Sequence, residues 1–264
     1  MAVWAPSQYE RFADQRNRPF FDLLGRVDAE KSSLVVDLGC GNGPLTLAAA
    51  QRWPGARVVG VDSSGDMLDR ARDLDTDGRV EWVQADVARW DLTGAGAPDV
   101  IVSNATLQWV PGHLDLIPGW LDALRPGGWF AMQVPGNFRA PSHVAIREVA
   151  AAQPRGAELT AALRADPVAE PPAYAEVLAS RCAHLDVWET TYLQVLDPAG
   201  EQDAPVLEWV KGTALRPLLD LLEGAEREAF LADLRDRLAH EYPRAAYGTP
   251  FPFRRIFAVG QVAA

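Results

Sequence analysis

The sequence predicts an α/β protein built on a mostly parallel, doubly wound sheet. Short apolar strands alternate with helix-forming segments, which is the pattern of such folds. A glycine-rich turn follows the first strand, and acidic or amide residues stand at the ends of successive strands. Because parallel strands end at one edge of their sheet, where these proteins bind ligands, we expect a binding site at that edge.

The first strand, 34–38, is a short β-branched and apolar run that leads into a turn and a helix expected over 45–53. The turn consists of small residues: Gly39, Cys40, Gly41 and Gly43 follow one another with a single intervening Asn. Glycine permits positive φ and lets a ligand approach the main chain. The spacing is not the G-x-G-x-x-G of dinucleotide-binding proteins. The preceding carboxylate, Asp37, suits a ligand that carries an ammonium group.

The second strand, 57–62, ends at Asp62, about 25 residues beyond Asp37, close to the ~20-residue spacing expected of a ribose-binding acid. Asp62 could instead cap the next helix, whose start is indicated by Ser63, Ser64 and Asp66. A third strand, 80–85, ends at Asp86.

The fourth strand, 100–104, continues into 105–109, and a helix then closes at a Pro-Gly-Gly break before a fifth strand, 129–134. The remaining chain predicts helices over 143–152, 156–164, 174–181, 206–213 and 225–240, and strands over 185–195 and 255–260. The long helix 225–240 carries Phe230, Leu234 and Leu238 on one face.

Composition excludes several classes of function. The net charge is −11, only Lys31 and Lys211 are lysines, and no basic run occurs, so we expect neither nucleic acid nor an acidic membrane as a partner. No apolar run reaches membrane-spanning length, and no secretion signal is visible. Two distant cysteines predict a reduced, cytoplasmic location, with Cys40 a small turn residue rather than a catalytic thiol. A monomer is favoured, although the sequence leaves the oligomeric state open.

The glycine turn resembles the first motif of class I S-adenosylmethionine-dependent methyltransferases. The whole chain is similar to the trans-aconitate 2-methyltransferase family, from Trp4, Pro6 and Tyr9 to the last strand. The motifs that carry this resemblance are 16–19, 103–109, 147–150, 186–192, 208–217 and 251–257. It implies a Rossmann-like, seven-stranded, mostly parallel sheet with helices on both faces and a helical lid.

The resemblance also implies a domain layout and a donor site. Residues 1–264 would form one methyltransferase domain, with a lid over the donor (1–30), a donor-binding core (31–134) and helical segments covering the acceptor (135–184 and 196–253). S-adenosylmethionine would be bound without a metal ion. The expected contacts are Tyr9, Arg18, Asp37, Gly39, Cys40 and Gly41 near the methionine moiety, Asp62 and Ser63 at the ribose, Met67, Asp86 and Val87 at the adenine, and Asn104 and Ala105 near the methyl group. The segment before the first strand could instead be a plain packing helix.

The implied acceptor is a small polycarboxylic acid that becomes a mono-methyl ester. A carboxylate is already an anion at neutral pH and needs no general base, so positioning is the main task. Arginine binds carboxylates through two hydrogen bonds, and Arg216 with Arg254 or Arg255 are the candidates. Each could instead form a structural ion pair, and Arg255 could simply begin the last strand. His143 could donate to a carboxylate or serve structure, and Gln108 and Trp109 could line the transfer region or pack.

Three other functions stay open at this stage. The chain could methylate another small molecule, such as a different free acid, a phenol or a carbon acceptor. It could bind S-adenosylmethionine without catalysis. A dinucleotide-dependent dehydrogenase is disfavoured by the glycine spacing and by Asp37. The motif of nucleic-acid amino methyltransferases is absent, because Asn104 is followed by Ala105 and Thr106.

Overall fold

A computed structural model of the chain describes residues 13–163 and 166–264. The described residues form a seven-stranded sheet of order β3-β2-β1-β4-β5-β7-β6. The strands are β1 (Leu34–Leu38), β2 (Arg57–Asp62), β3 (Val80–Gln84), β4 (Val100–Asn104), β5 (Trp129–Pro135), β6 (Cys182–Leu196) and β7 (Thr249–Val262). Strands β1 to β5 pair in parallel, whereas β7 is antiparallel to β5. The predicted mostly parallel α/β fold is therefore confirmed.

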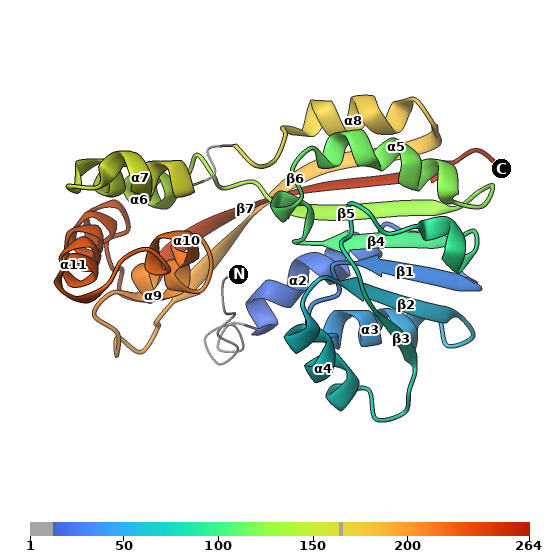
Figure 1. The fold of residues 1–264 in the computed structure, drawn as a ribbon, viewed down its shortest axis with the longest axis horizontal. Helices are drawn as coiled ribbons and strands as arrows, with labels where there is room; N and C mark the ends of the chain where they lie inside the picture. Colours follow the sequence, from blue (N-terminus) through green and yellow to red (C-terminus); the bar gives the residue numbers. More distant parts are fainter. Residues whose placement is uncertain (1–12, 164–165) are drawn as a thin grey trace. The chain divides into compact units, whose positions relative to one another are not determined.

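Helices cover both faces of this sheet (Figure 1). One face carries α2 (Ala13–Leu24), α3 (Pro44–Arg52) and α4 (Gly65–Leu74), and the other carries α5 (His113–Ala123) and α8 (Pro171–Ala179). The chain order β3-β2-β1-β4 reverses direction between β1 and β4. Such a switch point opens a crevice at the carboxyl ends of the strands, so the fold itself selects the edge that holds Gly39 and Asn104.

The core follows from strand alternation. On β5, Phe130, Met132 and Val134 are fully buried and pack with Trp120 and Leu121 of α5. Burying each such side chain stabilises the fold by about 1.5–3 kcal/mol. The alternate β5 residues project toward the opposite face, which α2 and α3 cover.

The chain divides into two compact units. Unit 2 holds β1 to β5 and parts of β6 and β7, and it comprises residues 17–135, 168–190 and 255–264. The described part of unit 1 comprises 13–16, 136–163, 166–167 and 191–254. Residues 168–184, part of the segment 135–184 that was expected to cover an acceptor, thus belong to the sheet unit, where α8 packs against α5.

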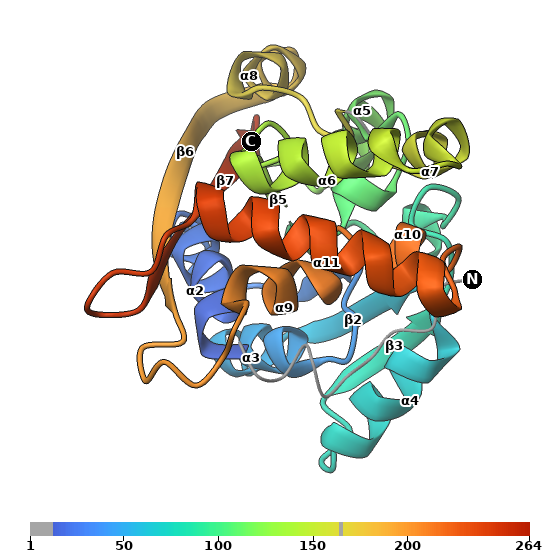
Figure 2. The same cartoon turned by 90° about the vertical axis from the view of Figure 1, so that its left-hand side faces the viewer.

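Unit 1 contains α6 (Pro141–Ala152), α7 (Gly156–Ala162), α9 (Pro205–Lys211), α10 (Arg216–Leu219) and α11 (Gly224–Glu241). Helices α6 and α11 run side by side (Figure 2). The predicted apolar face of α11 is confirmed, since Phe230, Leu234 and Leu238 are buried. The rings of Trp209 and Phe251 lie 5.7 Å apart inside the same core.

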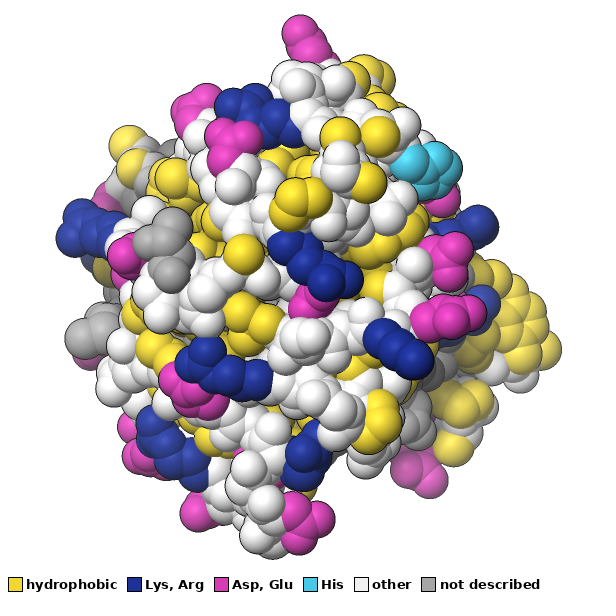
Figure 3. All heavy atoms as spheres, turned by 90° about the vertical axis from the view of Figure 1, so that its right-hand side faces the viewer, with side chains coloured by type: hydrophobic (Ala, Val, Ile, Leu, Met, Phe, Trp, Pro, Cys, Tyr) yellow, Lys and Arg dark blue, Asp and Glu magenta, His cyan; other side chains and the backbone are white. Residues whose placement is uncertain are grey.

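The described residues contain no helix that is both long and apolar enough to span a membrane. Basic and acidic side chains are interspersed on the face that Figure 3 shows, rather than gathered in one region of a single sign. The negative net charge is therefore not concentrated on that face.

Candidate functional site

The glycine-rich turn after β1 exposes backbone atoms, not covered by side chains, at the carboxyl edge of the sheet. The amides of Gly39 and Cys40 both donate to the carbonyl of Val61, at 2.8 and 3.0 Å, which ties the turn to β2. Gly41 adopts a φ of 56°, and no atom lies within 4 Å of the place where its Cβ would be. The main chain of Gly41 is therefore open to a ligand.

Asp37 is buried beneath this turn. Its Oδ2 accepts a 2.6 Å hydrogen bond from the Thr46 hydroxyl of α3. The pKa of Asp37 is raised to about 7, mainly by burial; the hydrogen bond from Thr46 opposes this shift and the nearby charge of Asp62 adds to it. Without a ligand, this carboxyl is thus poised between its neutral and charged forms near neutral pH. A cationic ligand group would favour the charged form.

Asp62 organises the turn from the end of β2. Its Oδ2 accepts from the amide of Gly41 and its Oδ1 from the amide of Ser64, both at 2.9 Å. The helix cap is supplied by Ser64, whose hydroxyl accepts from the amide of Met67 at 3.4 Å. Each carboxylate oxygen of Asp62 has a second lone pair, so the same group could also accept from two hydroxyls of a ligand.

The third candidate acid, Asp86, stands two residues beyond β3 and accepts from the amide of Ala88 at 2.9 Å. Val87 is buried, Ser63 is exposed and Met67 is half-buried. The ends of β1, β2 and β3 are neighbours in the sheet, so their candidate residues share one edge.

The segment after β4 is a strained and well-braced turn. Ala105 has a φ of 53°, in the left-handed region that non-glycine residues rarely adopt. Thr106 Oγ1 donates to the carbonyls of Gly39 and Asn104, and Gln108 Nε2 donates to that of Ala105. Backbone strain of this kind concentrates at functional sites.

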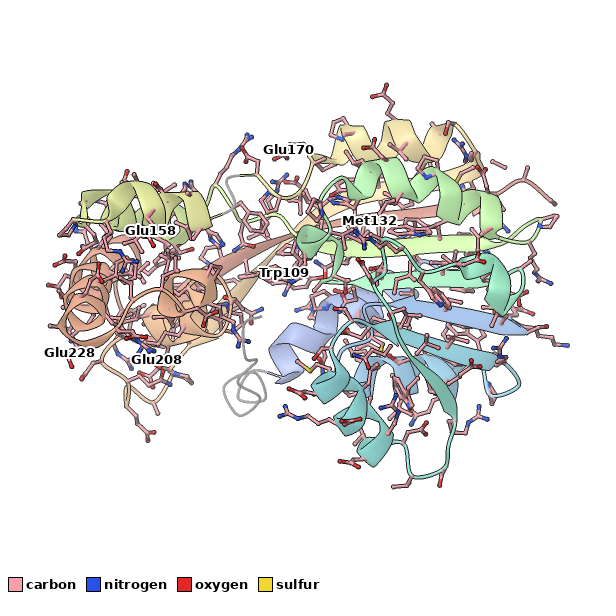
Figure 4. All side chains as sticks on the ribbon, in the orientation of Figure 1. Trp109, Met132, Glu158, Glu170, Glu208 and Glu228 are labelled. Carbon is pink, nitrogen blue, oxygen red and sulfur yellow. The ribbon has the colours of Figure 1, made fainter. Side chains whose placement is uncertain are left out.

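A short 3-10 helix, η2 (Leu107–Trp109), follows this turn. Gln108 is buried, but Trp109 is 45% exposed despite its large apolar ring. Trp109 lies at the edge of the sheet where β4 ends, whereas Met132 lies within the sheet (Figure 4). An exposed aromatic ring at the ligand edge favours a role in binding over one in packing.

Cys40 lies inside the glycine turn and is buried. Burial raises the pKa of its thiol, and the charges of Asp37 and Asp62 raise it further. The thiolate is the nucleophilic form of cysteine, so this residue is not equipped for nucleophilic catalysis.

In unit 1, two arginines brace the turn that follows β5. Arg254 donates to the carbonyl of Gly136 at 3.2 Å, and Arg147 donates to that of Phe138 at 2.8 Å. Burial and the charge of Arg147 lower the pKa of His143 to about 4, so its imidazole is neutral at neutral pH.

The other predicted arginines have separate environments. Arg216 begins α10, and its burial lowers its pKa while the charge of Asp220 opposes that shift. Arg255 is buried on β7, opposite Pro135. Adjacent strand residues point to opposite faces, so the side chains of Arg254 and Arg255 project in opposite directions from β7. Their roles in acceptor binding stay predictions.

Two predicted donor contacts differ in how far the structure describes them. Tyr9 lies outside the described residues. Arg18 is exposed on α2 and forms a 3.6 Å ion pair with Asp22. Their expected contacts with the methionine moiety stay predictions, as does the N-terminal lid.

Four further polar residues of the two units were not predicted from the sequence, because only the folded structure shows their hydrogen bonds or their burial: Thr46, Thr106, Gln133 and Arg147. The position of Thr106 shortly after a strand could have indicated its role. No local sequence feature indicated a role for the other three residues. Among residues 13–163 and 166–264, no group of three His, Cys, Asp or Glu residues could hold a metal ion.

The sheet order, the glycine turn and the polar strand ends define a class I methyltransferase. A family model described as a methyltransferase domain matches residues 35–128. Two solved structures share the fold over 93–94% of this chain at 13–16% identity: phosphoethanolamine N-methyltransferase 2 of Haemonchus contortus with S-adenosyl-L-homocysteine (TM-score 0.54, 52% of that chain) and the YcgJ protein of Bacillus subtilis (TM-score 0.55, 99% of that chain).

Curated relatives match nearly the whole chain. A trans-aconitate 2-methyltransferase of Streptomyces avermitilis is 50% identical over 97% of this chain and 96% of the relative. Those of Rhodococcus jostii and Azoarcus sp. are 47% and 44% identical over 98% of this chain and 99–100% of the relative. The chain belongs to the trans-aconitate 2-methyltransferase family.

Proposed function

We propose that the chain transfers the methyl group of S-adenosylmethionine to one carboxylate of trans-aconitate, giving a mono-methyl ester. One observation carries this proposal: the 44–50% identity to trans-aconitate 2-methyltransferases spans 97–98% of the chain. It therefore includes unit 1, which lies entirely outside the methyltransferase domain match at 35–128.

The donor site has the groups that the methyl donor requires. We assign Asp62 and Ser63 to the ribose hydroxyls. Met67, in α4, and Asp86 and Val87, just beyond β3, are assigned to the adenine. The open main chain of Gly41 and the buried Asp37 suit the charged methionine end. Gly39, Cys40, Asn104 and Ala105 complete the edge.

When bound, the donor supplies a methyl group already activated by a positively charged sulfur. A carboxylate oxygen forms the new O–CH₃ bond as the S–CH₃ bond breaks, and that electron pair stays on sulfur, leaving a neutral thioether and a neutral ester. No proton moves, so the chain needs no general base. Its residues orient the two groups and exclude water.

The acceptor's carboxylates require cationic partners, and unit 1 supplies them. We assign this role to Arg254 and Arg216, with neutral His143 as a hydrogen-bond donor. Arg254 and Arg147 already place two guanidinium groups on the turn 136–138. The rings of Trp209 and Phe251 pack in the hydrophobic core of the same unit.

The test is a panel of small acids incubated with the purified chain and isotopically labelled S-adenosylmethionine. We expect donor-dependent ester formation with trans-aconitate, at a single position assigned by mass spectrometry. Esterification of a different acid alone, or methylation only of a phenol or amine, would contradict the assigned acceptor. Donor binding without any methylated product would indicate a non-catalytic binding protein. From the two distant cysteines we further infer a cytoplasmic enzyme.

A further inference from the structure

Gln133 is the least satisfied polar side chain at the carboxyl edge of the sheet. It lies on β5, is 0% exposed, and neither its Nε2 nor its Oε1 has a hydrogen-bond partner. Enclosing a carboxamide without partners is unfavourable by roughly 1–3 kcal/mol on mutational scales. A shape-matched apolar residue would avoid that cost, so the retained carboxamide indicates a polar group that binds there.

The neighbouring strand carries a second buried carboxamide with an unpartnered atom. Asn104 on β4 is in register with Gln133, and its Oδ1 is buried without a partner. Aligned residues of adjacent parallel strands project to the same face, so the two carboxamides lie side by side. The chain between them is fixed as well, because the amide of Ala105 donates to the carbonyl of Gln133 at 2.9 Å.

These atoms stand beside the glycine turn. The carbonyls of Asn104 and Gly39 both accept from Thr106 Oγ1, at 3.2 and 3.1 Å. The strained Ala105 follows directly, with its φ of 53°. The unpartnered side-chain atoms of Gln133 and Asn104 therefore lie at the carboxyl ends of β4 and β5, next to the turn after β1. All of these residues belong to unit 2.

The hydrogen-bonding chemistry of these unpartnered atoms favours one kind of ligand group. Two oxygens require donors, and one amide nitrogen requires an acceptor. An α-amino acid group offers both, through its ammonium hydrogens and its carboxylate oxygens. A polycarboxylate offers only acceptors and would face two carboxamide oxygens.

We propose that Gln133 and Asn104 bind the aminocarboxyl end of the methyl donor, directly or through one ordered water. This assignment rests on the proposed function. Gln133 thereby contributes to donor selection from a strand that the glycine motif does not include. These side chains form their hydrogen bonds only when the donor is bound. The residues at this position therefore lower the stability of the ligand-free fold and raise its affinity for the donor.

The test uses Gln133→Met, which keeps the length and shape of the side chain and removes its polar atoms. Affinity is measured by calorimetry for S-adenosylhomocysteine and for 5′-methylthioadenosine, which lacks the aminocarboxyl group. We expect about tenfold or greater weakening for S-adenosylhomocysteine, as for the loss of a hydrogen bond to a charged group. The affinity for 5′-methylthioadenosine should be unchanged, and the Tm should rise.

The matched control is Gln261→Met on the paired strand β7, where Nε2 donates to the carbonyl of Gly127 at 3.0 Å. It should lower the Tm slightly and leave both affinities unchanged. Equal weakening of both ligands by Gln133→Met, or unchanged affinity for both, overturns the proposal. A raised acceptor KM with unchanged S-adenosylhomocysteine affinity also overturns it, in favour of an acceptor contact. If the unaltered chain does not bind S-adenosylhomocysteine at all, the proposed function itself fails.

Discussion

Thr106 occupies the space that a side chain on Gly39 would need. The Thr106 hydroxyl donates to the carbonyl of Gly39 at 3.1 Å, and a Cβ on Gly39 would overlap the Thr106 side chain. Gly39 also has a φ of 84°. Two residues 67 positions apart thus hold the ends of β1 and β4 together at the switch point of the sheet.

Gly39→Ala should therefore damage both stability and donor binding. Left-handed backbone strain and steric overlap each contribute roughly 1–3 kcal/mol, and urea unfolding would measure their sum. Thr106→Ala in the same chain should restore part of the loss, because it removes two of the overlapping atoms. Gly55→Ala is the control, since its Cβ would meet no atom within 4 Å, and it should change stability by less than about 0.5 kcal/mol.

Asp62→Ala should reduce donor affinity through two separate effects. It removes the acceptors proposed for the ribose hydroxyls, where each hydrogen bond to a charged group contributes about 1.5–3 kcal/mol before compensation. It also releases the amides of Gly41 and Ser64. Calorimetry with S-adenosylhomocysteine should show a loss of about tenfold or more, and Asp66→Ala, at an exposed position of α4, should show almost none. Unchanged affinity in Asp62→Ala would contradict the ribose assignment.

Donor binding should strengthen as the pH rises from about 6 to 8. The pKa of Asp37 is raised to about 7 by burial, and the positively charged donor favours its ionised form, so binding releases a proton. Calorimetry in buffers of different ionisation enthalpy would detect that proton. Asp37→Asn should weaken binding at pH 8 and remove the proton release. A flat pH profile in the unaltered chain would show that Asp37 does not sense the donor.

The same group has the opposite effect on the ligand-free fold. The folded chain retains the Asp37 proton up to about pH 7, whereas an unfolded chain releases it near the ordinary pKa of 3.8. The contribution of Asp37 to stability is therefore greatest below pH 4 and declines as the pH rises toward 7. Asp37→Asn should remove this decline, as measured by the free energy of unfolding at pH 5 and pH 8. An unchanged difference between the two pH values would contradict the raised pKa.

Arg216→Ala and Arg254→Ala should each impair use of the acceptor. Loss of one partner of a buried Arg–carboxylate pair costs about 3–5 kcal/mol, so kcat/KM for the acid should fall roughly a hundredfold or more. Arg→Lys should restore only part of it, because the two-pronged contact is lost. Donor affinity should stay unchanged, and Arg235→Ala on the exposed side of α11 should leave both parameters intact. A variant that loses only donor affinity would show that its arginine binds S-adenosylmethionine rather than the acid.

The sheet was predictable because its strands are short apolar runs bounded by turns. The predicted bounds of β1, β2 and β4 match the structure. Strand β7 begins at Thr249 rather than Arg255, since Pro250 and Pro252 disguise a strand whose alternate residues Phe251 and Phe253 are buried. Arg255 thus lies within this strand and does not begin it. The four-residue helix α10 was not predicted, because one turn leaves no periodic pattern.

The residues of the donor site were harder to foresee than the strands that carry them. Motif spacing placed Asp37, Asp62 and the glycines at one edge. It did not reveal that Asp62 binds the turn itself, or that Thr46 and Thr106 brace it. The contacts of Asp62 and Thr106 depend on how neighbouring strands align, and that of Thr46 on the path of the turn between β1 and α3, neither of which a local sequence pattern specifies.

The buried thiol of Cys40 has a practical consequence. Burial also raises the pKa of Cys182, to about 11, so both cysteines are protonated at neutral pH and react slowly with alkylating agents and peroxide. The native cysteines should therefore not interfere with site-directed labelling of the chain. A single cysteine introduced at an exposed position such as Tyr247 would take up a maleimide fluorophore selectively, without prior removal of the native pair.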